Sequence, residues 1–266
     1  MPKKVAQVHF IQSLDRGLTI LQAVATSSQP VTLGELSELL GVDRSSAYRL
    51  AQTLRRRGFL STPAGRKDYI LGSAIWTLSR RYDWSNMLVR VAHQELKVLA
   101  QGLNETAHLA IREGRNALFI DSVHANRVIV VAGQTGELVP LHATAHGKAL
   151  LADLDEKELR RIFGSDPLQK FSKATIKTIP ALVRECVAIR ERGYAIDEAE
   201  YMEGMRCIAA PIRLNSGMIV GSIGISAPAS RFPKDHYSSN SKLVMRCAKK
   251  IGELLSASEE AAEQSA

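Results

Sequence analysis

Cysteine is scarce in this chain of 266 residues, which holds only Cys186, Cys207 and Cys247. The three are widely spaced and odd in number, and no CxxC pair occurs. A disulfide framework and a zinc ribbon both need paired, closely spaced cysteines, so neither is indicated. We therefore expect reduced, mostly buried thiols and no metal.

Long hydrophobic runs and nucleotide-binding glycine motifs are also missing. No apolar run approaches the ~20 residues needed to span a bilayer, and the start, MPKKVAQVHF, lacks the sustained apolar core of a signal peptide. Neither a GxGxxG fingerprint nor a P-loop occurs. We expect a cytoplasmic protein with no membrane partner and no cofactor.

Charge is abundant but unevenly distributed. The chain carries a net charge of +8. Residues 1–85 hold 12 Lys and Arg against 6 Asp and Glu, whereas residues 86–266 hold 23 against 21. An excess of positive charge in one third of the chain is the electrostatic footprint of a nucleic-acid partner. The length is sufficient for two domains.

Residues 13–60 predict three short helices. Apolar residues recur at helical spacing in three sets: Leu14, Leu18 and Leu21; Leu33, Leu36, Leu39 and Leu40; and Ala47, Leu50, Ala51 and Leu54. Thr32 and Glu35 form a capping-box pattern at the start of the second helix. Gly41 would end that helix and Asp43 would cap the third. This short, glycine-containing connection is typical of a helix-turn-helix.

The third helix presents a polar face opposite its apolar one. Its predicted DNA-contacting residues are Arg44, Ser45, Ser46, Tyr48, Arg49, Gln52 and Arg56. Arg and Gln can pair bidentately with guanine and adenine edges in the major groove. The serines can donate to phosphates or base edges, and the run Arg55–Arg57 suits a phosphate backbone. The alternative interpretation is a solvated face of an ordinary helical bundle.

A hairpin is predicted directly after this helix. Residues 59–61 and 67–71 are strand-like, and residues 63–65 form a turn signal. The domain is therefore expected to be winged, with Arg66 and Lys67 near the wing tip, where they could contact phosphate or the minor groove. They could equally be solubilising loop charges.

The remaining chain predicts an α+β domain with one antiparallel sheet. The expected helices cover residues 73–85, 86–102, 144–163 with a break near 154–155, 180–192 up to Gly193, and 234–256. The expected strands cover residues 106–111, 117–123, 128–132, 207–214 and 218–226, the last two joined by a hairpin turn at 215–217. We thus predict a DNA-binding domain (1–72), a linker helix (73–85), a second domain (86–258) and a frayed polar tail (259–266).

Motifs from both halves resemble the IclR family of bacterial transcription regulators. They are SLDRGLTIL (13–21), RSSAYRLAQTL (44–54), GELVPLHATAHGKALLA (136–152), RERGYAIDEAEYMEGMRCIAAPI (190–212) and GSIGISAP (221–228). The resemblance runs from about Ser13 to Leu255. It implies a winged helix-turn-helix, a linker helix and a GAF-like effector-binding domain. It also implies a homo-oligomer, a dimer or dimer of dimers, on partly palindromic double-stranded operator DNA, modulated by a small metabolite that is often a carboxylate.

The resemblance also implies an effector pocket. The matching positions are Leu141, His142, Ala143, Thr144, Asp197, Cys207, Gly224 and Ser226. Gly224 and Ser226 are two apart on a predicted strand and so face the same side. Some relatives have serine at both positions. Gly224 would therefore leave a wider pocket with one hydroxyl fewer, which counts against a glyoxylate- or pyruvate-like effector. The helix start near Thr144 would offer backbone N–H groups to a carboxylate.

Two other functional classes can be weighed on particular residues. Cys207 with His142 or His146 could form a thiol–imidazole pair, but a cysteine in the apolar run CIAAPI is typical of an inert core residue. The two histidines could share a helix face as metal ligands, but no HExxH frame or third ligand accompanies them. We therefore expect that the protein is not an enzyme. A ligand-independent DNA-binding protein whose second domain only oligomerises is the alternative; the small residues of the pocket argue against it.

Overall fold

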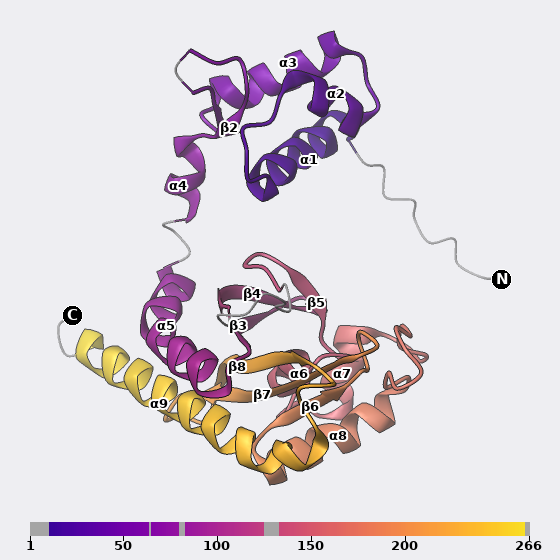
Figure 1. The fold of residues 1–266 in the computed structure, drawn as a ribbon, viewed down its shortest axis with the longest axis vertical. Helices are drawn as coiled ribbons and strands as arrows, with labels where there is room; N and C mark the ends of the chain where they lie inside the picture. Colours follow the sequence, from indigo (N-terminus) through magenta and orange to yellow (C-terminus); the bar gives the residue numbers. More distant parts are fainter. Residues whose placement is uncertain (1–10, 64, 80–82, 125–132, 264–266) are drawn as a thin grey trace. The chain divides into compact units, whose positions relative to one another are not determined.

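The structure is a computed structural model that describes residues 11–63, 65–79, 83–124 and 133–263. The chain divides into two compact units, Met1–Asp83 and Trp84–Ala266 (Figure 1). Within the described residues, no helix is long and apolar enough to cross a membrane.

The first unit is a small helical domain with a two-stranded hairpin. Its elements are α1 (Gln12–Thr26), α2 (Leu33–Leu40), α3 (Arg44–Arg56), β1 (Leu60–Ser61), β2 (Ile70–Leu71) and α4 (Ser73–Ser79). β1 pairs with β2 in antiparallel fashion, and Val31 forms an isolated bridge with Tyr69. The hydrophobic core of this domain includes Ile20, Leu36 and Ala51. The predicted winged helix-turn-helix is therefore present.

The helix ends follow the predicted capping signals. The Thr32 hydroxyl accepts a hydrogen bond from the Glu35 backbone N–H, and the Glu35 carboxylate accepts one from the Thr32 N–H in return. Gly41 ends α2 in the left-handed region, with φ 59°. The Asp43 carboxylate accepts from the Ser46 N–H at 2.9 Å and so begins α3. These local signals mark where α2 ends and α3 begins.

The apolar stripe predicted for α1 is wrong in part. Leu14 and Leu18 are 60% and 52% exposed, and the buried face instead carries Gly17, Ile20 and Val24. α1 has apolar residues on more than one side, so spacing alone does not identify the buried side. The same holds in α2, where Leu36 is buried but Leu39 is 52% exposed.

The linker helix predicted over residues 73–85 falls on two described helices. α4 ends at Ser79, and Asp83 already begins the long helix α5 (Asp83–Leu103). Trp76 of α4 is 70% exposed. Residues 80–82 lie outside the described residues. The predicted single helix therefore corresponds to α4 and the first turn of α5.

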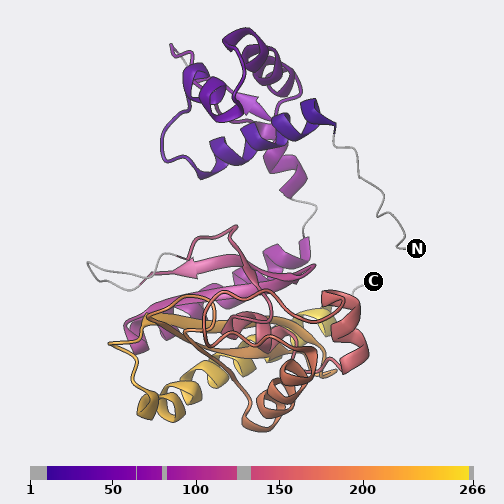
Figure 2. The same cartoon turned by 90° about the vertical axis from the view of Figure 1, so that its right-hand side faces the viewer.

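The second unit is built on one antiparallel sheet. Its strands are β3 (Thr106–Glu113), β4 (Asn116–Val123), β5 (Leu138–Pro140), β6 (Ala195–Glu198), β7 (Met205–Arg213) and β8 (Ile219–Pro228). They pair in the order β5-β4-β3-β8-β7-β6. The helices are α5, α6 (Ala145–Leu150), α7 (Glu156–Phe163), α8 (Ile179–Arg192), the 3-10 turn η1 (Lys234–His236) and α9 (Tyr237–Glu263). α9 runs along the sheet (Figure 2).

Alternation along the strands separates the two faces of this sheet. In β8, Ile223 and Ile225 pack into the core formed with α5 and α9. Ser222 and Ser226 point to the opposite face, where α6, α7 and α8 pack. Both faces are thus covered, and the polar positions of the central strands lie beneath α6.

Most elements of the second unit match the prediction, with three exceptions. The break in the helical region 144–163 and the end of α8 at Gly193, with φ 86°, are confirmed. β5 and β6 are three and four residues long and were not predicted. α9 continues to Glu263, so a tail frayed from residue 259 is wrong. The strand predicted at 128–132 lies outside the described residues.

Candidate functional site

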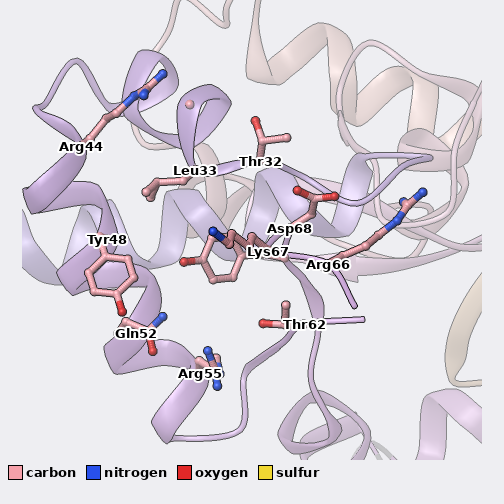
Figure 3. A pocket seen from close by; sticks show the side chains of 12 residues that line it. Thr32, Leu33, Arg44, Tyr48, Gln52, Arg55, Thr62, Arg66, Lys67 and Asp68 are labelled. Atoms are coloured by element: carbon pink, nitrogen blue, oxygen red, sulfur yellow. The ribbon is translucent and has the colours of Figure 1, made fainter. Parts of the chain in front are cut away.

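A hollow of about 640 Å³ lies between α2, α3 and the hairpin of the first unit. Arg44, Tyr48, Gln52 and Arg55 follow one another along α3 on one side (Figure 3). The other lining residues are Thr32, Leu33, Gly34, Thr62, Arg66, Lys67, Asp68 and Tyr69. Four of these lining side chains are cationic and one is anionic. The surface is therefore suited to a polyanion.

The structure divides the predicted DNA-contacting residues into two groups. Arg44, Tyr48, Gln52, Arg66 and Lys67 line the hollow. The others lie elsewhere on α3, and they are Ser45, Ser46, Arg49 and Arg56.

The second group lies on the solvent side of α3. Ser45, Arg49 and Arg56 are exposed, on the side of α3 away from the buried Ala47 and Ala51. Ser46 is half-buried and donates its hydroxyl hydrogen to the Asp43 carboxylate at 2.7 Å. Arg49 lies within 3.4 Å of the Ser46 hydroxyl.

The site residues of the first unit that the sequence did not single out lie around the rim of the hollow. Arg55 belongs to the run of three arginines, so a signal for it existed. Thr32, Leu33 and Thr62 join the lining only because α2 and the hairpin fold against α3. Nothing in their local sequence marks them.

The second unit contains a small cavity of about 80 Å³ beneath α6. Its lining residues are His108, Phe119, Gly133, Glu137, Val139, Thr144, Ala145, His146, Asp197, Tyr201, Met202, Met205, Cys207 and Ser226. Of the eight positions expected from the family resemblance, the structure brings four together here, Thr144, Asp197, Cys207 and Ser226.

Leu141, His142 and Ala143 are buried beside the cavity instead of lining it. Leu141 belongs to the core packed around α7 and α8. The His142 ring contacts Phe163 and Phe171, and its Nε2 lies 2.8 Å from the Gln169 carbonyl. These residues form the turn before α6 and pack behind the side chains that line the cavity.

Gly224 is the fourth of the expected positions that does not line the cavity. A Cβ atom on Gly224 would lie 2.2 Å from the Ile208 carbonyl oxygen and 2.7 Å from the Ala209 Cβ. The glycine therefore permits close approach of β7 to β8. The sequence led us to expect that Gly224 would widen the pocket, but the glycine does not line the cavity.

Asp197 supplies the buried carboxyl of the cavity. It is 2% exposed, and its Oδ1 accepts a hydrogen bond from the Glu200 N–H at 2.7 Å. Burial raises the pKa of Asp197 to about 7, against the lowering by that hydrogen bond. The Asp197 carboxyl therefore keeps its proton up to a pH of about 7, whereas an ordinary aspartate loses its proton around pH 3.8.

The imidazoles of the cavity are held uncharged. Burial lowers the pKa of His108 to about 3 and lowers the pKa of His146 well below its ordinary value. The Nδ1 of His108 lies 2.9 Å from the Ser122 hydroxyl oxygen of β4, and the Nδ1 of His146 lies 3.1 Å from the Ser222 hydroxyl oxygen. Ser222 is fully buried in β8.

The thiol of Cys207 is protonated and already engaged. It donates to the Ser226 hydroxyl oxygen at 3.2 Å, and burial raises the pKa of the Cys207 thiol. The thiol–imidazole pair considered above would need a thiolate. Within the described residues, no hydrogen bond joins Cys207 to a histidine.

No lysine or arginine lines this cavity among the residues that the structure describes. The nearby Lys148, 1% exposed, bonds to the Glu200 carboxylate and lies 3.7 Å from Glu185. Arg206 donates to the Phe232 carbonyl at 2.9 Å, as expected for a residue on the other side of the strand from Cys207. A ligand in this cavity would therefore be recognised by donors other than lysine or arginine side chains.

The cavity residues that were not predicted come from β3, β4, β5 and the segment that leads into it, α6, and the turn between β6 and β7 with the first residue of β7. His108 and Phe119 stack with ring centroids 4.4 Å apart, although they lie on separate strands. Tyr201 and Met205 belong to a motif already noted, IDEAEYMEGM, but their spacing carried no signal for a pocket.

Comparisons with known proteins agree across both units. The model of the IclR helix-turn-helix domain matches residues 13–63, and the model of the bacterial transcriptional regulator IclR C-terminal domain matches residues 83–253. The HTH-type transcriptional repressor AllR of Escherichia coli K12 is 31% identical over 244 residues, covering 92% of this chain and 90% of AllR.

Solved structures show the same fold. The IclR protein of Thermotoga maritima is 28% identical with a TM-score of 0.74, covering 93% of this chain and all of that one. An IclR homologue of Microbacterium hydrocarbonoxydans, solved with 4-hydroxybenzoate, is 21% identical with a TM-score of 0.74, covering 90% and 97%. With a helix-turn-helix at its start and the matching C-terminal domain after it, the chain belongs to the IclR family of bacterial transcriptional regulators.

Proposed function

We propose that this regulator binds a partly palindromic operator as a homo-oligomer, a dimer or dimer of dimers, and controls catabolic genes in response to a small organic acid. The observation that carries the proposal is the small cavity of the second unit, lined by Thr144, Asp197, Cys207 and Ser226 and separate in the chain from the cationic hollow of the first unit. Relatives support it: AllR is named a repressor, and the Microbacterium homologue was solved with 4-hydroxybenzoate.

DNA recognition is assigned to α3 and the hairpin. α3 enters the major groove, where Arg49 and Gln52 read base edges. Arg56, Arg66 and Lys67 bind phosphates, which contribute salt-dependent affinity without sequence choice. Two-fold related copies of α3 would read the two operator half-sites.

The effector is assigned to the cavity by its size and donors. A volume of about 80 Å³ is well below the roughly 300–1,000 Å³ of pockets for drug-sized molecules, which favours a short-chain acid. A protonated Asp197 can donate a hydrogen bond to a carboxylate without a lysine or arginine in the cavity lining. Ser226 accepts from Cys207 and can donate its own hydrogen into the cavity.

Regulation requires that the effector bind one arrangement of the oligomer more tightly than another. Equal binding to both arrangements would shift nothing. The effector must therefore change the affinity of the protein for operator DNA. This change in affinity can be measured directly.

A thermal-shift screen of the full chain against short hydroxy acids, keto acids, aromatic acids and sugar acids tests the proposal. A ligand at about 100 times its Kd should stabilise the protein by roughly 2.7 kcal/mol. The shift should disappear in Asp197→Ala and persist in Glu113→Ala, which removes an exposed carboxylate from the end of β3. The active acid should also change affinity for an operator selected from random duplexes. Absence of a shift with every class would contradict a sensing role.

A further inference from the structure

The ring of His146 on α6 is held in one orientation above the sheet. Its Nδ1 lies 3.1 Å from the hydroxyl oxygen of Ser222 on β8. The rings of Phe119 and His108 meet it edge-on, with centroids 5.3 Å and 5.9 Å from its own. The His146 side chain is only 2% exposed, so these contacts fix the ring in place.

The other ring nitrogen of His146 lacks a partner. The two nitrogens of an imidazole point in different directions, so Nε2 is directed away from Ser222. This atom is buried and has no hydrogen-bond partner among the described residues. Buried polar atoms of folded proteins are nearly always paired. Because the His146 ring lines the cavity, a molecule bound there can supply the missing partner.

The polar side chains at the floor of the cavity lie in a row across the sheet. Asp197 of β6 pairs with Cys207 of β7, which pairs in turn with Ser226 of β8. Ser222, which holds the His146 ring, lies four residues from Ser226 on the same strand. This separation is about 13 Å between Cα atoms at the usual rise of a strand. A carboxyl group bound by Asp197 and Ser226 therefore leaves the Nε2 of His146 to a second group of the ligand.

That second group must be uncharged. No lysine or arginine lines the cavity among the residues that the structure describes, whereas the acidic residues Glu137 and Asp197 do. Burial lowers the pKa of His146 well below its ordinary value, so the imidazole stays neutral and does not balance a second carboxylate. A hydroxyl group can pair with Nε2 in either tautomer of the ring.

We propose that His146 is an effector-contacting residue, and that the cavity takes a short acid with an uncharged oxygen-bearing group at the end remote from its carboxyl. This assignment rests on the proposed function. The carboxyl lies against Asp197 and Ser226, and the remote oxygen bonds to the Nε2 of His146. An acid of the same length without that oxygen leaves the nitrogen unpaired and binds more weakly.

Isothermal titration calorimetry of the full chain with three four-carbon acids tests this ligand class. 4-Hydroxybutyrate carries the remote hydroxyl, 2-hydroxybutyrate carries its hydroxyl beside the carboxyl, and butyrate carries none. 4-Hydroxybutyrate should bind at least about tenfold more tightly than butyrate or either enantiomer of 2-hydroxybutyrate, because one buried polar atom gains its partner. Equal affinities, tighter binding of another of these acids, or no binding of 4-hydroxybutyrate would overturn the assignment.

Variants of His146 test whether the ring makes the contact. His146→Leu removes both ring nitrogens, so it should lower the affinity for 4-hydroxybutyrate to that for butyrate. His146→Gln keeps a polar end and should retain part of the preference. The control His236→Gln replaces an exposed histidine of η1 and should leave all affinities unchanged. A preference that persists in His146→Leu would remove His146 from the site.

Nuclear magnetic resonance of ¹⁵N-labelled histidine reports on the same contact in the wild-type protein. The His146→Gln spectrum assigns the ring signals of His146. The Nε2 signal should move when 4-hydroxybutyrate binds and should respond far less to butyrate. A signal that stays in place at saturation with 4-hydroxybutyrate would show that the ligand does not reach this nitrogen.

The thermal screen separates this assignment from the proposed function. If another acid class stabilises the wild-type protein and 4-hydroxybutyrate does not, the regulator still senses an acid and only the present assignment fails. If no acid stabilises the protein, both fail.

Discussion

Asp197 shows how position changes the chemistry of a single residue. The sequence marks it as an acidic residue of a family motif. In the structure, it caps the turn after β6 through the Glu200 N–H, and burial raises its pKa to about 7. One side chain thus supports a turn and offers a neutral donor to the cavity.

The raised pKa of Asp197 predicts a pH-dependent contribution to stability. Between the ordinary aspartate pKa of 3.8 and about 7, the folded state holds this proton more tightly than the unfolded state. Asp197 should therefore stabilise the protein less as pH rises through this window. Asp197→Asn keeps the acceptor but removes the titration.

Chemical denaturation of wild-type and Asp197→Asn protein across this window measures the effect. The free energy of unfolding of the wild type relative to the variant should fall with rising pH, by on the order of a few kcal/mol in total. A difference that stays constant would show that Asp197 titrates normally.

Arg49 belongs to the solvent face of α3, and its substitution should alter base preference. Arg49→Ala should relax selection at one operator base pair and cost about 1–3 kcal/mol there. Arg49→Lys keeps the charge but not the bidentate geometry, so it should also lose selectivity. Arg16→Ala removes the same charge from α1, outside the hollow.

Selection from random duplexes with each Arg49 variant measures this preference. Arg16→Ala should leave the selected sequence unchanged. An unchanged sequence in both Arg49 variants would mean that Arg49 does not read a base.

At the scale of the elements, two glycines inside helices have opposite surroundings. A Cβ added to Gly17 in α1 would meet no atom within 4 Å, whereas one added to Gly252 in α9 would lie 2.0 Å from the Arg213 carbonyl oxygen of β7. Helix propensity alone favours alanine over glycine at both positions. Packing should reverse this preference at Gly252.

Gly17→Ala should therefore stabilise the first unit by about 0.5–1 kcal/mol. Gly252→Ala should destabilise the second by on the order of 1–3 kcal/mol. Differential scanning calorimetry of the two variants tests the pair. If both substitutions changed the stability by the same amount and in the same direction, helix propensity, and not the contact between helix and sheet, would determine the effect at both glycines.

The elements also show what periodicity can and cannot predict. The capping signals at Thr32, Gly41 and Asp43 act within a few residues, and they were predicted correctly. β5 and β6 are edge strands of three and four residues, too short for an alternating pattern to reveal them. The buried side of α1 likewise depends on its packing against α3 and the hairpin.

At the scale of the whole molecule, the positive charge is concentrated in the DNA-binding unit. Residues that bind phosphate release counterions, so affinity falls with salt in proportion to the number of contacts. Replacing Arg55 and Arg66 with glutamine removes two cations from the hollow. The logarithmic salt slope should decrease by about two.

Fluorescence anisotropy with the selected operator, between about 50 and about 200 mM salt, measures this slope. Lys157→Gln with Lys173→Gln removes the same charge from exposed positions of the second unit and serves as the control. Identical slopes for the two double variants would place Arg55 and Arg66 away from the phosphates.

The sequence by itself determined the two-part organisation, the helix-turn-helix, its caps and the family, because these depend on local patterns and ordered motifs. It also named four cavity residues, Thr144, Asp197, Cys207 and Ser226. Only the tertiary structure decided the rest of that wall. Strand pairing brings His108 of β3 beside Ser122 of β4, and packing of α6 on the sheet brings His146 to Ser222 of β8. Contacts between residues 14 and 76 positions apart leave no periodic trace in the chain, so these two histidine–serine pairs become visible only in three dimensions.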